Sequence, residues 1–293
     1  MTETNRRLRP RRSVLYMPGA NARAMEKSRE IDCDTVIFDL EDAVAPDAKA
    51  TARGQVATAV SAGGFGHREV VVRINGLDTP WGRDDAAAVA ALPIDALLVP
   101  KIETAEQVQA YERILAGTRA ATIPIWVMIE TPRGVLGIER LLAHAPRVDV
   151  VVLGTSDLVK DLRARHMPNR ESVLAALSHC VLAARAFDRV VLDGVHLDFK
   201  DLASFERVCQ QGRDLGFDGK TLIHPTQVEI ANAVFGPSAQ DVEQARRVVA
   251  AWADAQRAGK GVAVVDGRLV ENLHAVEAER VLAFADALAK RSR

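Results

Sequence analysis

The sequence predicts an α/β fold, a (β/α)8 (TIM) barrel followed by a C-terminal helical lid extension. Short apolar runs rich in Val, Ile and Leu recur eight times, and a stretch with helical periodicity follows each of them. These runs are too apolar for a sheet with one face in water, which indicates parallel strands covered by helices. A chain of 293 residues with 48% hydrophobic content can bury such a core.

The expected strands, in chain order, are residues 13–17, 35–40, 69–74, 95–99, 124–129, 149–153, 190–193 and 221–223. The expected helices are residues 22–31, 47–62, 83–91, 105–116, 134–145, 170–187, 201–215 and 226–234. Eight successive strand–helix units favour a closed barrel over an open doubly wound sheet. A dinucleotide-binding sheet is also disfavoured because no strand-to-helix turn carries Gly-x-Gly-x-x-Gly.

The C-terminal residues fall outside the barrel repeat. We expect a catalytic barrel domain over residues 1–235 and a helical extension over residues 236–293. Two helices are expected there, over 239–256 and 273–289, separated by glycines and the short apolar piece 262–265. The glycine hinges suggest a lid that packs on the barrel mouth or on a neighbouring subunit. A simple capping helix is the alternative.

Charge and cysteine content narrow the class of protein. The 38 basic and 39 acidic residues nearly balance, which gives no reason to expect a nucleic-acid partner. No apolar stretch approaches the roughly 20 residues of a membrane-spanning helix, so no membrane association is expected. The three cysteines lack metal-type or redox-type spacing, which fits a reducing compartment. We therefore expect a cytoplasmic protein.

Polar side chains follow most of the expected strands, where a barrel enzyme has its active site. They crowd the rim formed by the strand ends and are Asp39, Glu41, Asp42, Arg73, Lys101, Glu130, Asp157, Asp193, Asp198 and His224. Glu130 and Asp157 end neighbouring strands, and such carboxylates favour a hard ion, Mg²⁺ or Mn²⁺, over Zn²⁺. Two protein ligands suit Mg²⁺, which keeps several waters. The alternative is that either carboxylate caps the following helix.

Three basic residues at the rim allow more than one role. Arg73 ends a buried strand and needs an anion, either a substrate carboxylate or a structural partner such as Glu41 or Asp42. Lys101 could form a Schiff base, but a neighbouring carboxylate such as Glu103 would keep it charged. His224 could act as a general base, although a structural role is the simpler interpretation.

Several segments together resemble the HpcH/HpaI aldolase and citrate lyase β-subunit family, within it the CitE-like and malyl-CoA lyase branch. The matching segments, in the family's order, are 12–19 (RSVLYMPG), 38–44 (FDLEDAV) with Lys49 and Arg53, 72–75 (VRIN), 100–101 (PK), 129–132 (IETP), 154–158 (GTSDL), 216–220 (GFDGK) and 223–225 (IHP). The resemblance spans nearly the whole barrel.

This resemblance implies a Mg²⁺-dependent carbon–carbon lyase. Such an enzyme cleaves or forms a 3-hydroxyacyl-CoA, such as malyl-CoA or citramalyl-CoA, from acetyl-CoA and a 2-oxo acid (glyoxylate, pyruvate or oxaloacetate). Glu130 and Asp157 would hold the metal, and Glu130 and Arg73 would face the oxo acid. Glu41 and Asp42 would lie behind the metal and contribute to catalysis without binding the ion directly. By analogy with the family, we expect a homotrimer or a hexamer.

The C-terminal segment departs from the family pattern. The branch carries an aspartate on a lid from the adjacent subunit that transfers the acetyl proton, within Asp-Gly-Lys/Arg-Met-Ile/Val-Asp. Residues 266–271 read DGRLVE here, so Glu271 replaces that aspartate with a side chain one methylene longer. The change leaves three alternatives open: an acyl-CoA thioesterase using the same site, the β-subunit of a citrate lyase complex, and a sensor that binds oxo acids without turnover. CoA phosphates also need cations, for which the arm 6–12, Arg23 or Lys27 are candidates.

Overall fold

The computed structural model describes residues 8–291 of the chain. It separates into two compact units. The larger unit covers Arg11–Asn232, and the smaller unit comprises the described parts of residues 1–10 and 233–293. None of the helices in the described range is long and apolar enough to cross a membrane. The expected domain boundary between residues 235 and 236 stays a prediction.

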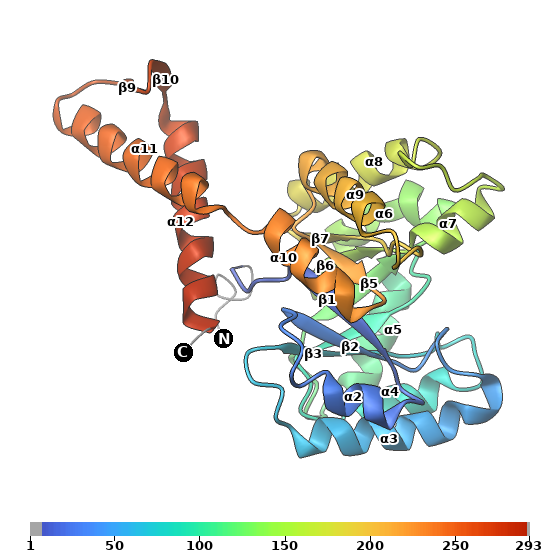
Figure 1. Cartoon of the computed structure of the whole chain (residues 1–293). Coiled ribbons are helices and arrows are strands. Elements are labelled where there is room, and N and C mark those ends of the chain that lie inside the picture. The colour runs from blue at the N-terminus through green and yellow to red at the C-terminus, as the bar shows by residue number, and fades with distance from the viewer. Residues whose placement is uncertain (1–7, 292–293) are drawn as a thin grey trace. The chain divides into compact units, whose positions relative to one another are not determined.

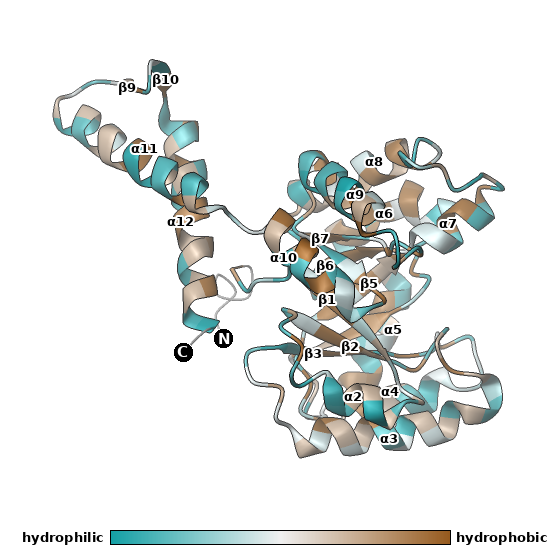
Figure 2. Ribbon diagram, in the orientation of Figure 1, coloured by the Kyte–Doolittle hydropathy of each residue, from teal (hydrophilic) through white to brown (hydrophobic). Residues whose placement is uncertain are grey.

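The larger unit is a closed barrel of eight parallel strands in chain order, as predicted (Figure 1). The strands are β1 (Ser13–Pro18), β2 (Thr35–Asp39), β3 (Glu69–Arg73), β4 (Ala96–Val99), β5 (Ile125–Ile129), β6 (Val148–Leu153), β7 (Val190–Asp193) and β8 (Gly219–Leu222). The first strand pairs with both the second and the last, and Ser13 lies opposite Lys220. Hydrophobic residues concentrate on these strands (Figure 2).

Helices surround the barrel. They are α2 (Ala22–Lys27), α3 (Lys49–Ala62), α4 (Gly82–Val89), α5 (Ala105–Leu115), α6 (Pro132–His144), α7 (Thr155–Asp161), α8 (Leu174–Ala186), α9 (Leu202–Leu215) and α10 (Val228–Phe235), with 3-10 turns η1 (Pro46–Ala48) and η2 (Pro225–Gln227). The helix expected over residues 170–187 corresponds to α8, whereas α7 was not among the expected helices. Asp157 therefore lies within the first turn of α7 rather than ahead of a helix.

The eighth strand begins two residues earlier than predicted, at Gly219. A β-carbon at Gly219 would lie 1.9 Å from the carbonyl oxygen of Arg11 and 2.9 Å from the α-carbon of Arg12. Only glycine lets the chain pass so close to the segment that enters β1. The pair Gly219 and Lys220 resembles a turn in the sequence and is instead the start of a buried strand.

Alternate strand residues point into the barrel and form one apolar cluster. Its strand members are Val14, Ile37, Val71, Ala96, Leu98, Trp126, Met128, Val150, Val152, Val190 and Leu192, with Tyr16 packed against them. Because side chains alternate along a strand, the residues two positions after Ile37, Val71 and Met128 share this inward face. These residues are Asp39, Arg73 and Glu130. The strand period itself thus directs one arginine and two carboxylates into the mouth of the barrel.

Asp193 has the opposite parity and faces the surrounding helices. It lies directly after Leu192 of the inner cluster, and its side chain is fully buried. Lys220 Nζ contacts its Oδ2 at 2.7 Å, and Arg170 Nη1 contacts its Oδ1 at 2.6 Å. The two cations hold the pKa of Asp193 below its usual value although burial alone would raise it. The expectation that Asp193 lies at the rim is therefore wrong, because it belongs to a buried ion pair behind the barrel wall.

The smaller unit is a helical hairpin closed by two short strands. Helix α11 (Ala239–Arg257) packs on α12 (Asn272–Arg291), and β9 (Ala263–Val265) pairs antiparallel with β10 (Arg268–Val270). The turn between these strands is Asp266-Gly267, with φ of 51° and 74°, values that suit a tight hairpin turn. Both helices agree with those expected from the sequence, whereas neither short strand was predicted.

Candidate active site

Glu130 lies at the mouth of the barrel, where β5 ends. It follows β5 directly and precedes Thr131, the N-cap of α6, whose hydroxyl accepts from the backbone N–H of Gly134 at 3.0 Å. The residue is 1% exposed, and its Oε1 accepts a hydrogen bond from the backbone N–H of Lys101 at 2.9 Å. Burial, together with the negative charge of Glu41, raises the pKa of Glu130 to about 7. A buried carboxylate of this kind is a favourable partner for a cation.

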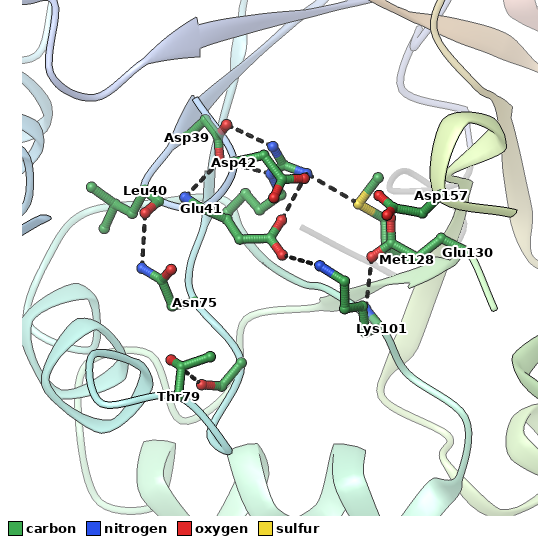
Figure 3. A network of polar contacts seen from close by, with 12 residues as sticks. Asp39, Leu40, Glu41, Asp42, Asn75, Thr79, Lys101, Met128, Glu130 and Asp157 are labelled. Atoms are coloured by element: carbon green, nitrogen blue, oxygen red, sulfur yellow. Dashed lines mark hydrogen bonds and ion pairs between the residues drawn. The ribbon is translucent and has the colours of Figure 1, made fainter. Parts of the chain in front are cut away.

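Asp157 comes from the neighbouring strand–helix connection. Ile129 pairs with Leu153 in the β5–β6 register, so the ends of these two strands lie side by side. The Asp157 side chain is 25% exposed, and its Oδ1 contacts Lys160 Nζ at 3.1 Å. Figure 3 shows the Glu130 and Asp157 side chains turned in the same direction, toward the side of the network where Glu41 and Asp42 lie. The N-cap of α7 is Gly154, without a side-chain cap hydrogen bond, so Asp157 is not the N-cap residue.

The donors present fit a hard divalent ion. Within residues 8–291, no three His, Cys, Asp or Glu side chains are grouped so that they could hold a metal. The site therefore offers two carboxylates from adjacent elements, one of them buried with a raised pKa. Mg²⁺ suits this set because it accepts few protein ligands and takes its remaining oxygens from water and substrate. The assignment of Glu130 and Asp157 as ligands remains a prediction.

Arg73 is held mainly by Asp39, a partner that the sequence analysis did not assign. Arg73 Nε and Nη2 donate to the two oxygens of Asp39 at 2.7 Å and 2.6 Å, a two-point contact between buried groups. The guanidinium lies over the ring of Tyr16, 4.9 Å from its centroid, and Nη1 contacts Met128 Sδ at 3.6 Å. Asp39 thereby fixes the plane of the guanidinium.

Glu41 and Asp42 also contact Arg73, in agreement with the structural alternative. Glu41 Oε2 lies 2.9 Å from Arg73 Nη1, and Asp42 Oδ2 lies 3.6 Å from it. Glu41 is buried, and burial raises its pKa although Arg73 and Lys101 oppose this. The Asp42 side chain is 58% exposed. Glu41 is therefore part of the buried cluster, whereas Asp42 lies at its edge (Figure 3).

Lys101 is paired with Glu41 rather than with Glu103. Its Nζ donates to Glu41 Oε1 at 2.8 Å, whereas Glu103 accepts from the Thr131 hydroxyl at 2.8 Å. Burial acts to lower the pKa of Lys101, but the hydrogen bond and charge of Glu41 raise it above its usual value. An amine that stays protonated is a poor nucleophile, so the geometry disfavours a Schiff base. The sequence analysis named Glu103 as the carboxylate that keeps Lys101 charged; the structure shows that Glu41 has this role.

A second layer of buried polar residues supports the loop that carries Glu41. Lys49 Nζ donates to the carbonyl oxygens of Leu40 and Glu41 at 2.9 Å and 2.7 Å, and to Asn75 Oδ1 at 2.8 Å. Asp85 accepts from Asn75 Nδ2 at 2.6 Å and from Arg53 Nε at 2.7 Å. Lys49 and Arg53 were noticed only as parts of a motif. The two residues are four positions apart and so lie on the same face of a helix, which is the sequence feature that could have indicated a shared role.

Other expected site residues have structural roles. The His224 ring caps η2 by accepting from the N–H of Thr226 at 3.3 Å, and it stacks on Phe199. Arg12 Nε contacts Asp34 at 2.9 Å, and buried Arg11 contacts Glu69 at 2.6 Å. These two arginines of the N-terminal arm are thus engaged in ion pairs within the barrel unit. Residues 6 and 7 lie outside the described range.

Glu271 lies in the smaller unit, directly after β10. Its side chain is exposed, and its backbone N–H donates to His274 Nδ1 at 3.0 Å at the start of α12. Exposed apolar residues cluster on the same hairpin and helix start, namely Val262, Val264, Leu269, Leu273 and Val276. The part that Glu271 plays in catalysis stays a prediction.

The raised pKa of Glu130 has a measurable consequence for the metal-free protein. The folded-state pKa of about 7 exceeds the usual value of 4.5, so folding favours the protonated form. The stabilisation of the folded protein that comes from protonated Glu130 is fully present below pH ~4.5 and is lost as the pH rises through about 7. We expect the Glu130→Gln variant, in EDTA, to gain stability over the wild type across this window, on the order of 3 kcal/mol at most. Thermal unfolding from pH 5 to 8 measures the difference, and a pH-independent difference would contradict it.

Comparison with known proteins identifies the family. A model of the HpcH/HpaI aldolase/citrate lyase family matches residues 12–225, which is nearly the whole barrel. The chain belongs to the HpcH/HpaI aldolase/citrate lyase family. Within this family, the chain is 49% identical over 280 residues, 96% of both chains, to a (3S)-malyl-CoA thioesterase of Cereibacter sphaeroides strain KD131. It is 33% identical to the citrate lyase subunit beta of Leuconostoc mesenteroides subsp. cremoris, over 95% of this chain and 94% of that one.

A solved structure has a similar fold. The CitE protein of Mycobacterium tuberculosis, in complex with magnesium, acetoacetate and coenzyme A, superposes with a TM-score of 0.78 at 29% identity. The similarity covers 96% of this chain and 99% of that one. The family assigned from scattered motifs is thus confirmed by matches over the full length.

Proposed function

We propose that this protein is a Mg²⁺-dependent hydrolase of a malyl-CoA-type thioester that releases free CoA and a hydroxy dicarboxylic acid. The observation that carries the proposal is the 49% identity, over 96% of both chains, to a (3S)-malyl-CoA thioesterase. The thioesterase alternative of the sequence analysis therefore takes precedence over the lyase. The buried site of Glu130, Asp157 and Arg73 supports it, because this site can receive a carboxylate-bearing acyl group.

Each residue of the site has a part in this proposal. Glu130 and Asp157 hold the ion, which when bound supplies positive charge that polarises a substrate oxygen. Arg73 keeps its charge in the buried site, and Asp39 fixes its plane, so that the guanidinium would meet a substrate carboxylate in a defined orientation. Lys101 and Arg73 neutralise Glu41 from two sides. The chain's own residues thus bind and orient an anionic acyl group before water attacks the thioester carbon.

Carbon–carbon cleavage is the second candidate function. The 33% identity to a citrate lyase subunit beta favours it, because the same family includes proteins named for that reaction. In that reaction the acyl-CoA would split into a 2-oxo acid and an enolate that must take up a proton. Both candidates use the same predicted metal site, so the products distinguish them.

The deciding experiment follows both products from each substrate. Purified protein with Mg²⁺ is incubated with malyl-CoA, citramalyl-CoA or citryl-CoA, and free thiol and 2-oxo acid are measured together. We expect free thiol from malyl-CoA without glyoxylate. Glyoxylate without free thiol would overturn the hydrolase and establish the lyase. Activity of the isolated chain on CoA thioesters would also exclude a subunit that works only within a citrate lyase complex.

We further propose that the smaller unit closes over the site of another copy of the chain. The exposed apolar residues of the hairpin and the start of α12 support this, since such a surface is unusual when left in water. In a homotrimer or a hexamer, Glu271 of one subunit would lie at the active site of a neighbouring subunit. Sedimentation at several protein concentrations tests the assembly.

Glu271 provides a separate prediction within this proposal. We expect Glu271→Gln to lower turnover of malyl-CoA by about a hundredfold, since general acid–base groups contribute 10²- to 10⁴-fold. Affinity for Mg²⁺ should not change, because the residue is not one of the proposed ligands. Glu279, an exposed glutamate on the helix α12 that follows Glu271, provides the matched control variant Glu279→Gln. Equal turnover in the two variants would remove Glu271 from the mechanism.

A further inference from the structure

Lys101 has a backbone conformation that is unfavourable for its residue type. It follows Pro100 at the end of β4 and has φ of 50°, in the left-handed region. A residue with a β-carbon seldom adopts this region unless its surroundings hold it there. The next residue, Ile102, is fixed because its N–H donates to the carbonyl oxygen of Met128 at 3.2 Å. The residue after Lys101 is thus held by β5, the strand that ends directly before Glu130.

The two ends of Lys101 contact two different carboxylates of the site. The backbone N–H donates to Glu130 Oε1 at 2.9 Å, and the ammonium donates to Glu41 Oε1 at 2.8 Å (Figure 3). Glu41 is in turn 2.9 Å from Arg73 Nη1. Lys101 therefore connects Glu130, the predicted metal ligand, to Glu41, which in turn contacts the predicted substrate-binding arginine. The ammonium contact also restrains the side chain and so helps to hold the strained backbone.

The second oxygen of Glu130 lies over a glycine. A β-carbon added at Gly154 would come 2.4 Å from Glu130 Oε2, so any other residue there would displace this oxygen. Lys101 thus engages Oε1, while Gly154 leaves room for Oε2. Together they fix the rotation of the carboxylate about its own axis.

We propose that Lys101 is a positioning residue that acts through its left-handed backbone to orient Glu130, so that Oε2 is the oxygen presented to the metal ion. This inference rests on the proposed function, because it needs Glu130 to be a ligand. Hydrogen bonds to the free oxygen of a ligating carboxylate commonly change metal affinity by 10- to 100-fold. The side chain of Lys101 serves mainly to stabilise the conformation that aims its N–H.

The test compares three variants that all lack the ammonium and differ in their tolerance of positive φ. Lys101→Gly adopts the left-handed region freely, Lys101→Ala adopts it at a cost, and the β-branched Lys101→Val is the least tolerant. The readout is the dissociation constant for Mn²⁺, measured from free Mn²⁺ by electron paramagnetic resonance on the full chain. We expect Lys101→Gly to bind within about threefold of the wild type and Lys101→Val about tenfold more weakly, with Lys101→Ala between them.

Each outcome either supports or overturns the inference. Equal affinities in the three variants would overturn it, because the backbone would then not matter. If Lys101→Val does not fold, the pair Lys101→Gly and Lys101→Ala, which differ by one methyl group, still decides the order. Wild-type kcat together with wild-type Mn²⁺ affinity in Lys101→Gly, which lacks the ammonium, would exclude a direct role of the ammonium on substrate. A wild-type protein that binds no Mn²⁺ would instead reject the metal site itself, and with it the proposed function.

Discussion

Replacing Glu130 with glutamine, or Asp157 with asparagine, is expected to lower thioester turnover at least a thousandfold. Each change removes one of two carboxylate charges that the site offers to a divalent ion, and electrostatic stabilisation of the reacting oxygen is commonly worth 10²- to 10³-fold or more. Glu130→Gln keeps its hydrogen-bond acceptor for the Lys101 N–H, so loss of structure is not the cause. Mn²⁺ titration by calorimetry should show affinity weakened by at least tenfold in both variants.

Two neighbouring carboxylates serve as controls for this result. Asp161→Asn lies one turn beyond Asp157 on α7 and removes a carboxylate that also contacts Lys160, at 3.7 Å. Glu103→Gln removes a carboxylate that contacts the Thr131 hydroxyl next to Glu130. Both should keep wild-type Mn²⁺ affinity and turnover within a few-fold. Wild-type metal binding in Glu130→Gln or Asp157→Asn would contradict the assignment of the ligands.

Replacing Arg73 with lysine is expected to lower kcat/KM for the thioester by at least a hundredfold. Lysine keeps the positive charge but cannot make the planar two-point contact with Asp39, and it cannot present a second pair of donors to a substrate carboxylate. The loss should appear mainly in KM and in the affinity for a free 2-oxo acid or hydroxy acid. Steady-state kinetics and calorimetric titration of malate measure the two effects.

An exposed arginine nearby provides the matched control for Arg73. Arg133 lies in the first turn of α6, its side chain is 80% exposed, and it contacts Glu103 at 3.5 Å. Arg133→Lys should leave kcat/KM within about twofold, as expected for a surface ion pair. If Arg73→Lys retained normal malate affinity, Arg73 would have only the structural role that its contact with Asp39 provides.

The architecture was predictable because its signal is repeated along the chain. Each strand is a short run of Val, Ile and Leu, and closure of eight such units needs no knowledge of individual contacts. The eighth strand was misplaced because its first residues, Gly219 and Lys220, do not resemble a strand. Lys220 is acceptable there only because Asp193, on the preceding strand, faces it at 2.7 Å. A sequence pattern cannot show that pairing, since it depends on the register of β7 and β8.

The sequence was sufficient to select most residues of the candidate site, but not to predict which of them contact one another. Glu130 and Arg73 were selected as strand-end residues, and alternation along β3 and β5 directs both inward. Asp39 follows the same rule on β2, and applying the rule there would have indicated the partner of Arg73. The contact of Lys101 with Glu41 could not be foreseen, because it depends on a left-handed backbone that a lysine does not suggest. Local strain of this kind arises from the folded structure rather than from residue preferences.

The closing pair of strands has a consequence for how the barrel assembles during synthesis. Ser13 on β1 aligns with Lys220 on β8, so the first strand finds its second neighbour only after almost the entire barrel has left the ribosome. Contacts between such distant residues carry the greatest loop-closure entropy and form late. Until then, β1 has an open edge, and nascent chains that expose such an edge are prone to associate with one another. When β8 docks, Lys220 becomes buried and must pair with Asp193. A shifted register would leave both charges unpaired, so this final step is selective for the correct register.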